Sequence, residues 1–213
     1  MLFPTFKTCK ENVIMKIIFE NWGAVVGMSF FALSSVYAEP PAKAEYIGVE
    51  NCRLCHMPHY DSWSETKMSN SYELLKPNIR AEAKQKAGLD PAADYTNDPV
   101  CLKCHVTGFM QPGGFTSIDE TPDMIGVQCE MCHGPGSIYT EMMIKKQGTY
   151  TLEEYKTLGG LTMPSEENNV CTAKCHNSAS PFTGSGYVFD FENRKASGTH
   201  RHDLDYIYMP FDF

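Results

Sequence analysis

The chain has 213 residues, 18 basic and 26 acidic side chains, a net charge of −8 and a mean hydropathy of −0.32. This acidic balance argues against nucleic acid or an anionic membrane surface as a partner, and it favours a basic docking partner or one that is not selected by long-range charge. The length predicts one or two domains.

The first 38 residues are typical of a secretory signal peptide. A basic start at 15–19 precedes an apolar stretch over 22–36, and Val36-Tyr37-Ala38 is a small-x-small cleavage site. A transmembrane anchor is the alternative, but the apolar run is short and a proline-rich linker follows it. We predict a signal peptide over 1–38, with Met15 as an alternative start, a linker over 39–45 and one domain over 46–213. The mature chain, with a net charge of −9, is then periplasmic or, as an alternative, extracellular.

Four short motifs dominate the predicted domain. Cys-x-x-Cys-His occurs at 52–56, 101–105 and 129–133, and a version with one additional residue occurs at 171–176. In this pattern two sulfurs bond to one porphyrin edge, and the histidine that follows ligates the iron from the proximal side. We expect the additional residue of the fourth motif to bulge outward while both sulfurs still reach the porphyrin. The predicted attachment cysteines are Cys52, Cys55, Cys101, Cys104, Cys129, Cys132, Cys171 and Cys175, and the proximal ligands are His56, His105, His133 and His176.

Two other uses of paired cysteines fit the pattern less well. Tetrahedral zinc sites do not need a histidine after every second cysteine. Redox-active cysteine pairs likewise have no use for four such histidines. The sequence therefore predicts four covalently attached haem c groups. Eight of the nine cysteines are used in this way, which leaves no disulfide framework.

The haems would form most of the core, so regular structure should be sparse. We predict a mainly α fold with much irregular structure, a single multihaem cytochrome c domain wrapped around four haems. Helices are expected over 61–68 and over 77–87, the second beginning at Pro77 and ending at Gly88. A tight turn is expected over 110–115, and a short helix from the Thr151 capping box to the glycines at 159–160. An aromatic tail over 187–211 should pack on the haems.

The distal ligands are fewer than the irons. Only His59, His200 and His202 remain after the four proximal histidines, so at least one iron uses methionine, another ligand or none. His59 is too close in sequence to His56 to reach the opposite face of the same haem. For His59 and His202 a surface role or a hydrogen bond to a ligand is the expected alternative. Methionines are numerous, and most would be packing residues. The sequence by itself leaves the distal choice open among Met57, Met68, Met110, Met124, Met131, Met142, Met143, Met163 and Met209.

Outside the haem motifs, from about Tyr46 to Met209, the chain resembles the tetrahaem cytochrome c-554 family. That family is known from ammonia-oxidising bacteria as an electron acceptor of hydroxylamine oxidoreductase. The similar segments are Ser62-Trp63, Leu75-Lys76-Pro77-Asn78, 82–87, 89–92, Asp94-Tyr95-Thr96 and 132–136.

The resemblance implies haems stacked in close pairs and a set of distal ligands. It places the distal histidine of the third haem on His200. The family's distal histidines of the fourth and first haems fall on Met68 and Met143, with Met142 as an alternative to Met143. The second haem, on His105, is implied to be five-coordinate beside Pro181-Phe182.

The resemblance implies an electron-transfer protein, with redox protein partners and no membrane association after signal cleavage. The family's known member is basic and docks on an acidic enzyme, whereas this chain is acidic, so the hydroxylamine oxidoreductase partnership does not carry over. Two alternatives remain. One is a reductase of a small ligand such as nitric oxide at the open second haem, and the other is a subunit of an extracellular cytochrome filament.

Overall fold

The computed structural model describes residues 43–147, 149–161, 169–183 and 186–204, all of which belong to the compact unit Ser35–Phe213. The predicted signal peptide and the linker up to residue 42 lie outside the described residues. So do Met163, Met209 and the last part of the aromatic tail, from residue 205 onward.

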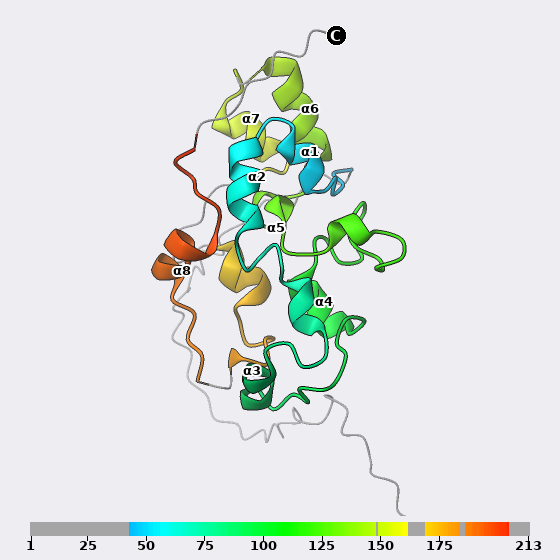
Figure 1. Ribbon diagram of the computed structural model, residues 1–213. Helices are drawn as coiled ribbons and strands as arrows, with labels where there is room; N and C mark the ends of the chain where they lie inside the picture. The colour runs from blue at the N-terminus through cyan, green and yellow to red at the C-terminus, as the bar shows by residue number, and fades with distance from the viewer. Residues whose placement is uncertain (1–42, 148, 162–168, 184–185, 205–213) are drawn as a thin grey trace, which may run out of the picture. The chain divides into compact units, whose positions relative to one another are not determined.

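Regular structure in the described residues is helical and short, as the sequence predicts (Figure 1). The one strand-like feature described is an isolated antiparallel bridge between Val106 and Ile125. No helix in the described part of the chain is both long enough and apolar enough to cross a bilayer. The elements in chain order are α1 (Val49–Arg53), α2 (Met57–Ser64), η1 (Tyr72–Leu75), α3 (Ala81–Lys86), α4 (Pro99–His105), η2 (Pro122–Met124), α5 (Cys129–His133), α6 (Ser137–Lys146), α7 (Leu152–Thr157), the π-helical turn η3 (Cys171–Cys175) and α8 (Phe191–Gly198).

Helix α2 begins and ends earlier than the predicted 61–68. Pro58 occupies its first turn, where proline needs no hydrogen-bond donor. At its end the Thr66 hydroxyl donates to the Trp63 carbonyl at 2.7 Å, and the Ser64 hydroxyl donates to the Asp61 carbonyl at 2.7 Å. These local side-chain bonds compete with continuation of the helix, so the chain turns after Ser64.

The prediction that Pro77 opens a helix is wrong. Asn78 and Arg80 both have positive φ, 60° and 54°, which no α-helix accommodates, so α3 begins only at Ala81. The predicted end is confirmed, since Gly88 has φ 75° and its N–H bonds the Gln85 carbonyl.

The predicted turn over 110–115 is confirmed. The Met110 N–H donates to the Phe115 carbonyl at 2.8 Å, and the Phe115 N–H donates to the Thr107 carbonyl at 2.9 Å. Gly113 has φ 73°, and a Cβ there would lie 2.2 Å from the Tyr46 carbonyl oxygen, so only glycine fits this approach of two backbone segments.

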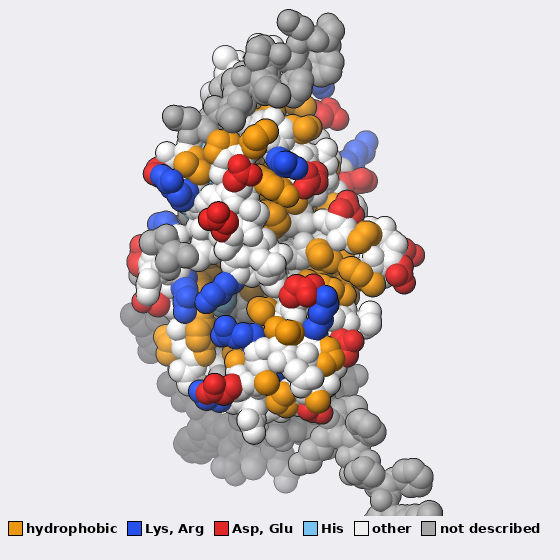
Figure 2. All heavy atoms as spheres, in the orientation of Figure 1, with side chains coloured by type: hydrophobic (Ala, Val, Ile, Leu, Met, Phe, Trp, Pro, Cys, Tyr) orange, Lys and Arg blue, Asp and Glu red, His pale blue; other side chains and the backbone are white. Residues whose placement is uncertain are grey.

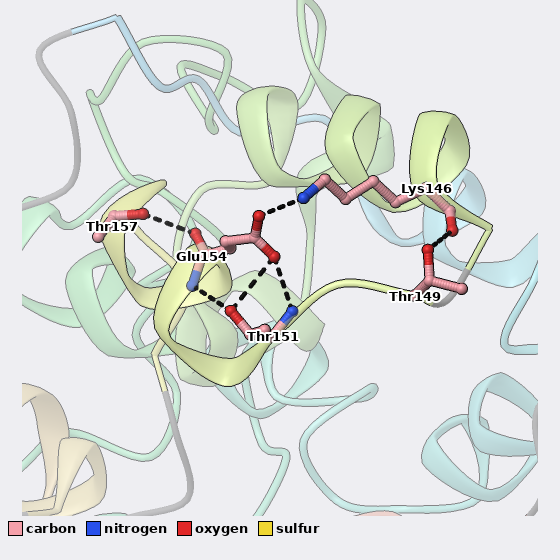
Figure 3. A network of polar contacts seen from close by, with 5 residues as sticks. All are labelled: Lys146, Thr149, Thr151, Glu154 and Thr157. Atoms are coloured by element: carbon pink, nitrogen blue, oxygen red, sulfur yellow. Dashed lines mark hydrogen bonds and ion pairs between the residues drawn. The ribbon is translucent and has the colours of Figure 1, made fainter.

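The predicted capping box at α7 is also confirmed (Figure 3). The Glu154 N–H donates to the Thr151 hydroxyl at 3.1 Å, and the Glu154 carboxylate accepts from the Thr151 N–H at 2.8 Å. The same carboxylate pairs with Lys146 at the end of α6, which ties the two helices together.

The contiguous apolar core of the described residues is small. Tyr95, Cys101, Phe109 and Ile125 pack against it, and its buried members are Tyr72, Leu75, Leu102, Val106, Phe115 and Met124. Hydrophobic side chains also form patches among acidic and basic ones on the face shown in Figure 2. A chain that encloses so little apolar volume depends on other material for its core.

Candidate functional site

The second and third motifs each lie within one helix, whereas the first begins in α1 and continues through the turn that ends at His56, the N-cap of α2. The second lies within α4, which Asp98 caps by accepting from the Val100 N–H at 2.8 Å, with Pro99 in the first turn. The third forms α5. In the first motif the His56 N–H donates to the Cys52 carbonyl at 2.9 Å, a helical i to i+4 bond. Cysteines three apart then share a face of the helix, and the histidine lies beside them.

The fourth motif retains this arrangement by a different backbone turn. Residues Cys171–Cys175 form a π-helical turn, and the His176 N–H donates to the Cys171 carbonyl at 2.7 Å. The bond spans five residues here and four in the first motif, so the additional residue is absorbed by the wider turn. The π-helical turn agrees with the expected bulge, and the reach of both sulfurs to one porphyrin stays a prediction.

The motifs lie against each other in pairs. Helix α1 contacts α5, and α4 contacts η3. Cys52 of the first motif interacts electrostatically with Cys129 of the third. The Cys104 Sγ of the second motif lies 3.9 Å from the Lys174 carbonyl oxygen of the fourth. The first motif therefore pairs with the third and the second with the fourth, and all eight described cysteines are free of disulfides.

Two buried side chains beside Cys129 join the first pair. The Gln128 amide oxygen accepts from the Val49 N–H at 2.8 Å, and the Glu130 carboxylate accepts from the Gly48 N–H at 2.8 Å. Gly48 supplies no side-chain cap to α1, so the start of α1 is capped by the third motif. Glu130 also accepts from the Gly136 N–H at 2.7 Å, and burial raises its pKa against the effect of these N–H bonds.

The His105 ring is oriented by a residue that the sequence analysis does not identify. Its Nδ1 lies 2.7 Å from the Ser71 carbonyl oxygen and donates to it, which leaves Nε2 with its lone pair for a metal. The Ser71 hydroxyl in turn donates to the His105 carbonyl at 2.9 Å. Nothing in the local sequence marks Ser71, because it lies 34 residues away from His105.

The four proximal histidines share one electrostatic property. Burial is the main cause that lowers the pKa of each, to about 4 for His133. At neutral pH they are therefore uncharged, the form in which imidazole binds a metal. The His176 ring stacks on Phe189 with ring centres 4.0 Å apart, which places part of the aromatic tail beside the fourth motif.

His133 and His200 face each other. Their ring centres lie 6.2 Å apart, with 28° between the ring planes. These two imidazoles would hold the iron of the third haem between them, as the resemblance implies. The Nδ1 of His200 lies 2.8 Å from the Arg201 carbonyl oxygen, so its Nε2 carries the lone pair. His59 and His202 lie beside His200, with ring centres 5.5 and 4.2 Å away.

The methionines of interest occupy different elements. Met68 is half-buried, and its carbonyl accepts from the Val127 N–H at 2.9 Å, just before the third motif. Met143 is half-buried in α6. Pro181 and Phe182 follow the fourth motif, whose turn η3 contacts α4. Ligation of iron by either methionine stays a prediction.

The residues fit haem. Hydrophobic side chains beside the attachment cysteines are left exposed by the polypeptide, with exposed fractions of 58% for Leu54 and 56% for Val100. A porphyrin bonded to those cysteines offers the apolar surface that such side chains need. No group of three or more His, Cys, Asp or Glu side chains in the described residues is arranged to hold a bare metal ion.

Comparison with known proteins agrees with this arrangement. The family model described as "Cytochrome c554 and c-prime" matches residues 51–134. Cytochrome c-554 of Nitrosomonas europaea is 46% identical over 112 residues, which are 53% of this chain and 47% of that protein, so the match spans about half the length of that relative. The solved structure of reduced cytochrome c554 from Nitrosomonas europaea matches with a TM-score of 0.61 and 36% identity over 75% of this chain and 86% of that one. The chain belongs to the cytochrome c554 family of multihaem c-type cytochromes and carries four covalently attached haem c groups.

Proposed function

We propose that this protein is a periplasmic electron carrier that passes electrons between redox partners through two connected haem pairs. The observation that carries the proposal is the pairwise packing of the motifs, with α1 against α5 and α4 against η3. When bound, each haem supplies an iron that gains and loses one electron. The polypeptide sets the spacing and the surroundings of the four irons.

One side chain connects the two pairs. The Lys174 ammonium, from the widened turn of the fourth motif, donates to the Met131 carbonyl of the third motif at 3.0 Å. Because Lys174 and Met131 each lie between the two cysteines of a motif, this bond would fix the spacing between the haems of the fourth and third motifs. It supports a continuous route through all four haems.

The predicted distal ligands complete the proposal. His200 would ligate the iron bound by His133, in keeping with the ring separation above. Met68 and Met143 would ligate the fourth and first irons, and the iron on His105 would keep an open face. Methionine sulfur favours ferrous iron more than imidazole does, so the methionine-ligated haems would have the higher potentials.

The proposed location and partners depend on the predicted signal peptide and on charge. Covalent attachment of haem after export agrees with a signal over 1–38, and the acidic mature chain would attract a basic redox protein. Donor and acceptor would then dock through complementary charge, and their reaction with this protein would slow as salt is added.

The test is rapid mixing of the fully reduced protein with a basic and with an acidic small c-type cytochrome. All four haems should be oxidised by the basic acceptor, faster than by the acidic one, and the rate should fall with ionic strength. Failure of one or more haems to exchange electrons would overturn the carrier function. A faster reaction with the acidic acceptor would overturn the proposed partner class alone.

A further inference from the structure

Lys84 is a buried lysine that the proposed function does not use. It lies in α3 with only 4% of its surface exposed. Its ammonium donates to the Lys76 carbonyl at 2.6 Å and lies over the Tyr95 ring, 5.4 Å from the ring centre. The carbonyl oxygen accepts a hydrogen bond from the ammonium, and the aromatic face attracts its charge.

The Lys84 charge is not neutralised by an ion pair in the described part of the chain. Its neighbours differ in this respect, since Lys76 pairs with Glu73 at 2.7 Å and Lys86 pairs with Glu82 at 2.8 Å, both at the surface. Burial of a cation without a carboxylate partner is costly for folding. Such a group is therefore a candidate for a functional charge.

This charge lies beside the second haem motif. Tyr95, under the ammonium, and Cys101 of the motif pack against the same buried cluster, which includes Leu102 and Val106 of the motif region. Lys84 and the second motif therefore border one buried cluster, with Tyr95 between the ammonium and that cluster.

Two carboxylates near the motif act in the opposite direction. Asp98 caps α4 and contributes to raising the pKa of Cys101, and Asp94 bonds the Thr96 N–H and hydroxyl. Asp94 is exposed and Asp98 is half-exposed, so water screens both. The buried ammonium is screened less, and its field acts through a medium of lower dielectric constant.

We infer that Lys84 raises the reduction potential of the haem attached at Cys101 and Cys104. Reduction adds one electron, supplied by the redox donor, to the ferric iron on His105, and a fixed positive charge nearby stabilises the added negative charge. Lys84 itself is neither oxidised nor reduced in this step. The inference requires haem at the second motif, and it does not depend on the electron-carrier function.

The test is redox titration of the four-haem protein carrying Lys84→Met. A second substitution, Cys104→Ala, labels the haem of the second motif by its absorption spectrum. In Cys104→Ala one vinyl group stays conjugated with the porphyrin, so the absorption band of this haem alone is displaced and its titration is followed separately. The redox equilibrium of the labelled haem should shift at least about tenfold toward the ferric form, about 59 mV for one electron. The other three haems should move less.

The matched control is Lys86→Met on the same helix, which removes an exposed, ion-paired lysine and should leave the labelled haem unchanged. Lys84→Arg keeps the charge and should restore most of the potential, whereas a merely structural role would leave it like Lys84→Met. If the methionine variant does not accumulate, Lys84→Gln replaces it. An unchanged labelled haem, or an equal shift of all four haems, would overturn the inference.

Discussion

Replacement of Gln128 by methionine should loosen the join between the first and third haem motifs. Gln128 is 3% exposed and makes three side-chain hydrogen bonds. Its oxygen accepts from the Val49 N–H at 2.8 Å, and its nitrogen donates to the Asp123 and Ile125 carbonyls at 2.6 and 3.0 Å. Methionine has nearly the same length and makes none of these bonds.

The expected loss follows from the number of bonds. A neutral hydrogen bond contributes about 1 kcal/mol net, so the three bonds contribute about 3 kcal/mol to the free energy of unfolding. For a chain of this size that change lowers Tm by about 6–12 °C. The buried Val49 N–H at the start of α1 would also lose its acceptor, which makes the estimate a lower bound.

The measurement is thermal unfolding of the haem-loaded protein followed by far-ultraviolet circular dichroism. The control is Gln85→Met, the same chemical change at an exposed position in α3, which should leave Tm nearly unchanged. Mass spectrometry of both variants should still show four haems, because no attachment cysteine is altered. If Gln128→Met lowers Tm no more than Gln85→Met does, the three bonds do not hold the motifs together.

The remaining predictions concern single sites. Deletion of Ala173, which converts the fourth motif to ordinary spacing, should leave four haems by mass, because the π-helical turn becomes an α-turn; a mass with three haems would contradict this. The ferrous haem on His105 should bind carbon monoxide, and four low-spin irons inert to carbon monoxide would show that it has no open face. The ferric protein should show a sulfur-to-iron charge-transfer band at the red edge of its spectrum that halves in Met68→Ala or Met143→Ala, and its absence from the unaltered protein would refute methionine ligation. The hydrogen bond from Lys146 at the end of α6 holds the pKa of Glu154 at about 2, against an ordinary 4.5. The contribution of Glu154 to the stability of α7 is therefore complete above pH 4.5 and is lost toward pH 2. Amide exchange in α7 that stays constant over this pH range would contradict the prediction.

Much of the function is readable from the sequence because haem attachment is a local event. The two sulfurs and the proximal imidazole of each site lie within six residues, so spacing by itself predicts them. The capping box at Thr151 and the end of α3 at Gly88 are equally local, and both are confirmed. Helix starts are less predictable when the helices have fewer than nine residues. No hydrophobic period develops over so short a span, and positive φ at Asn78 and Arg80 overrides the preference of Pro77.

The pairing of the motifs is decided by tertiary structure alone. Cys52 lies 77 residues before Cys129, and nothing in either motif specifies the other as its partner. Gln128 shows the reason, because its bonds to Val49 and to the 123–125 segment depend on backbone groups that every residue carries. The same holds for His105, whose ring is oriented by the main-chain carbonyl of Ser71. The sequence thus predicts which residues bond haem, and the folded backbone determines which motifs are neighbours.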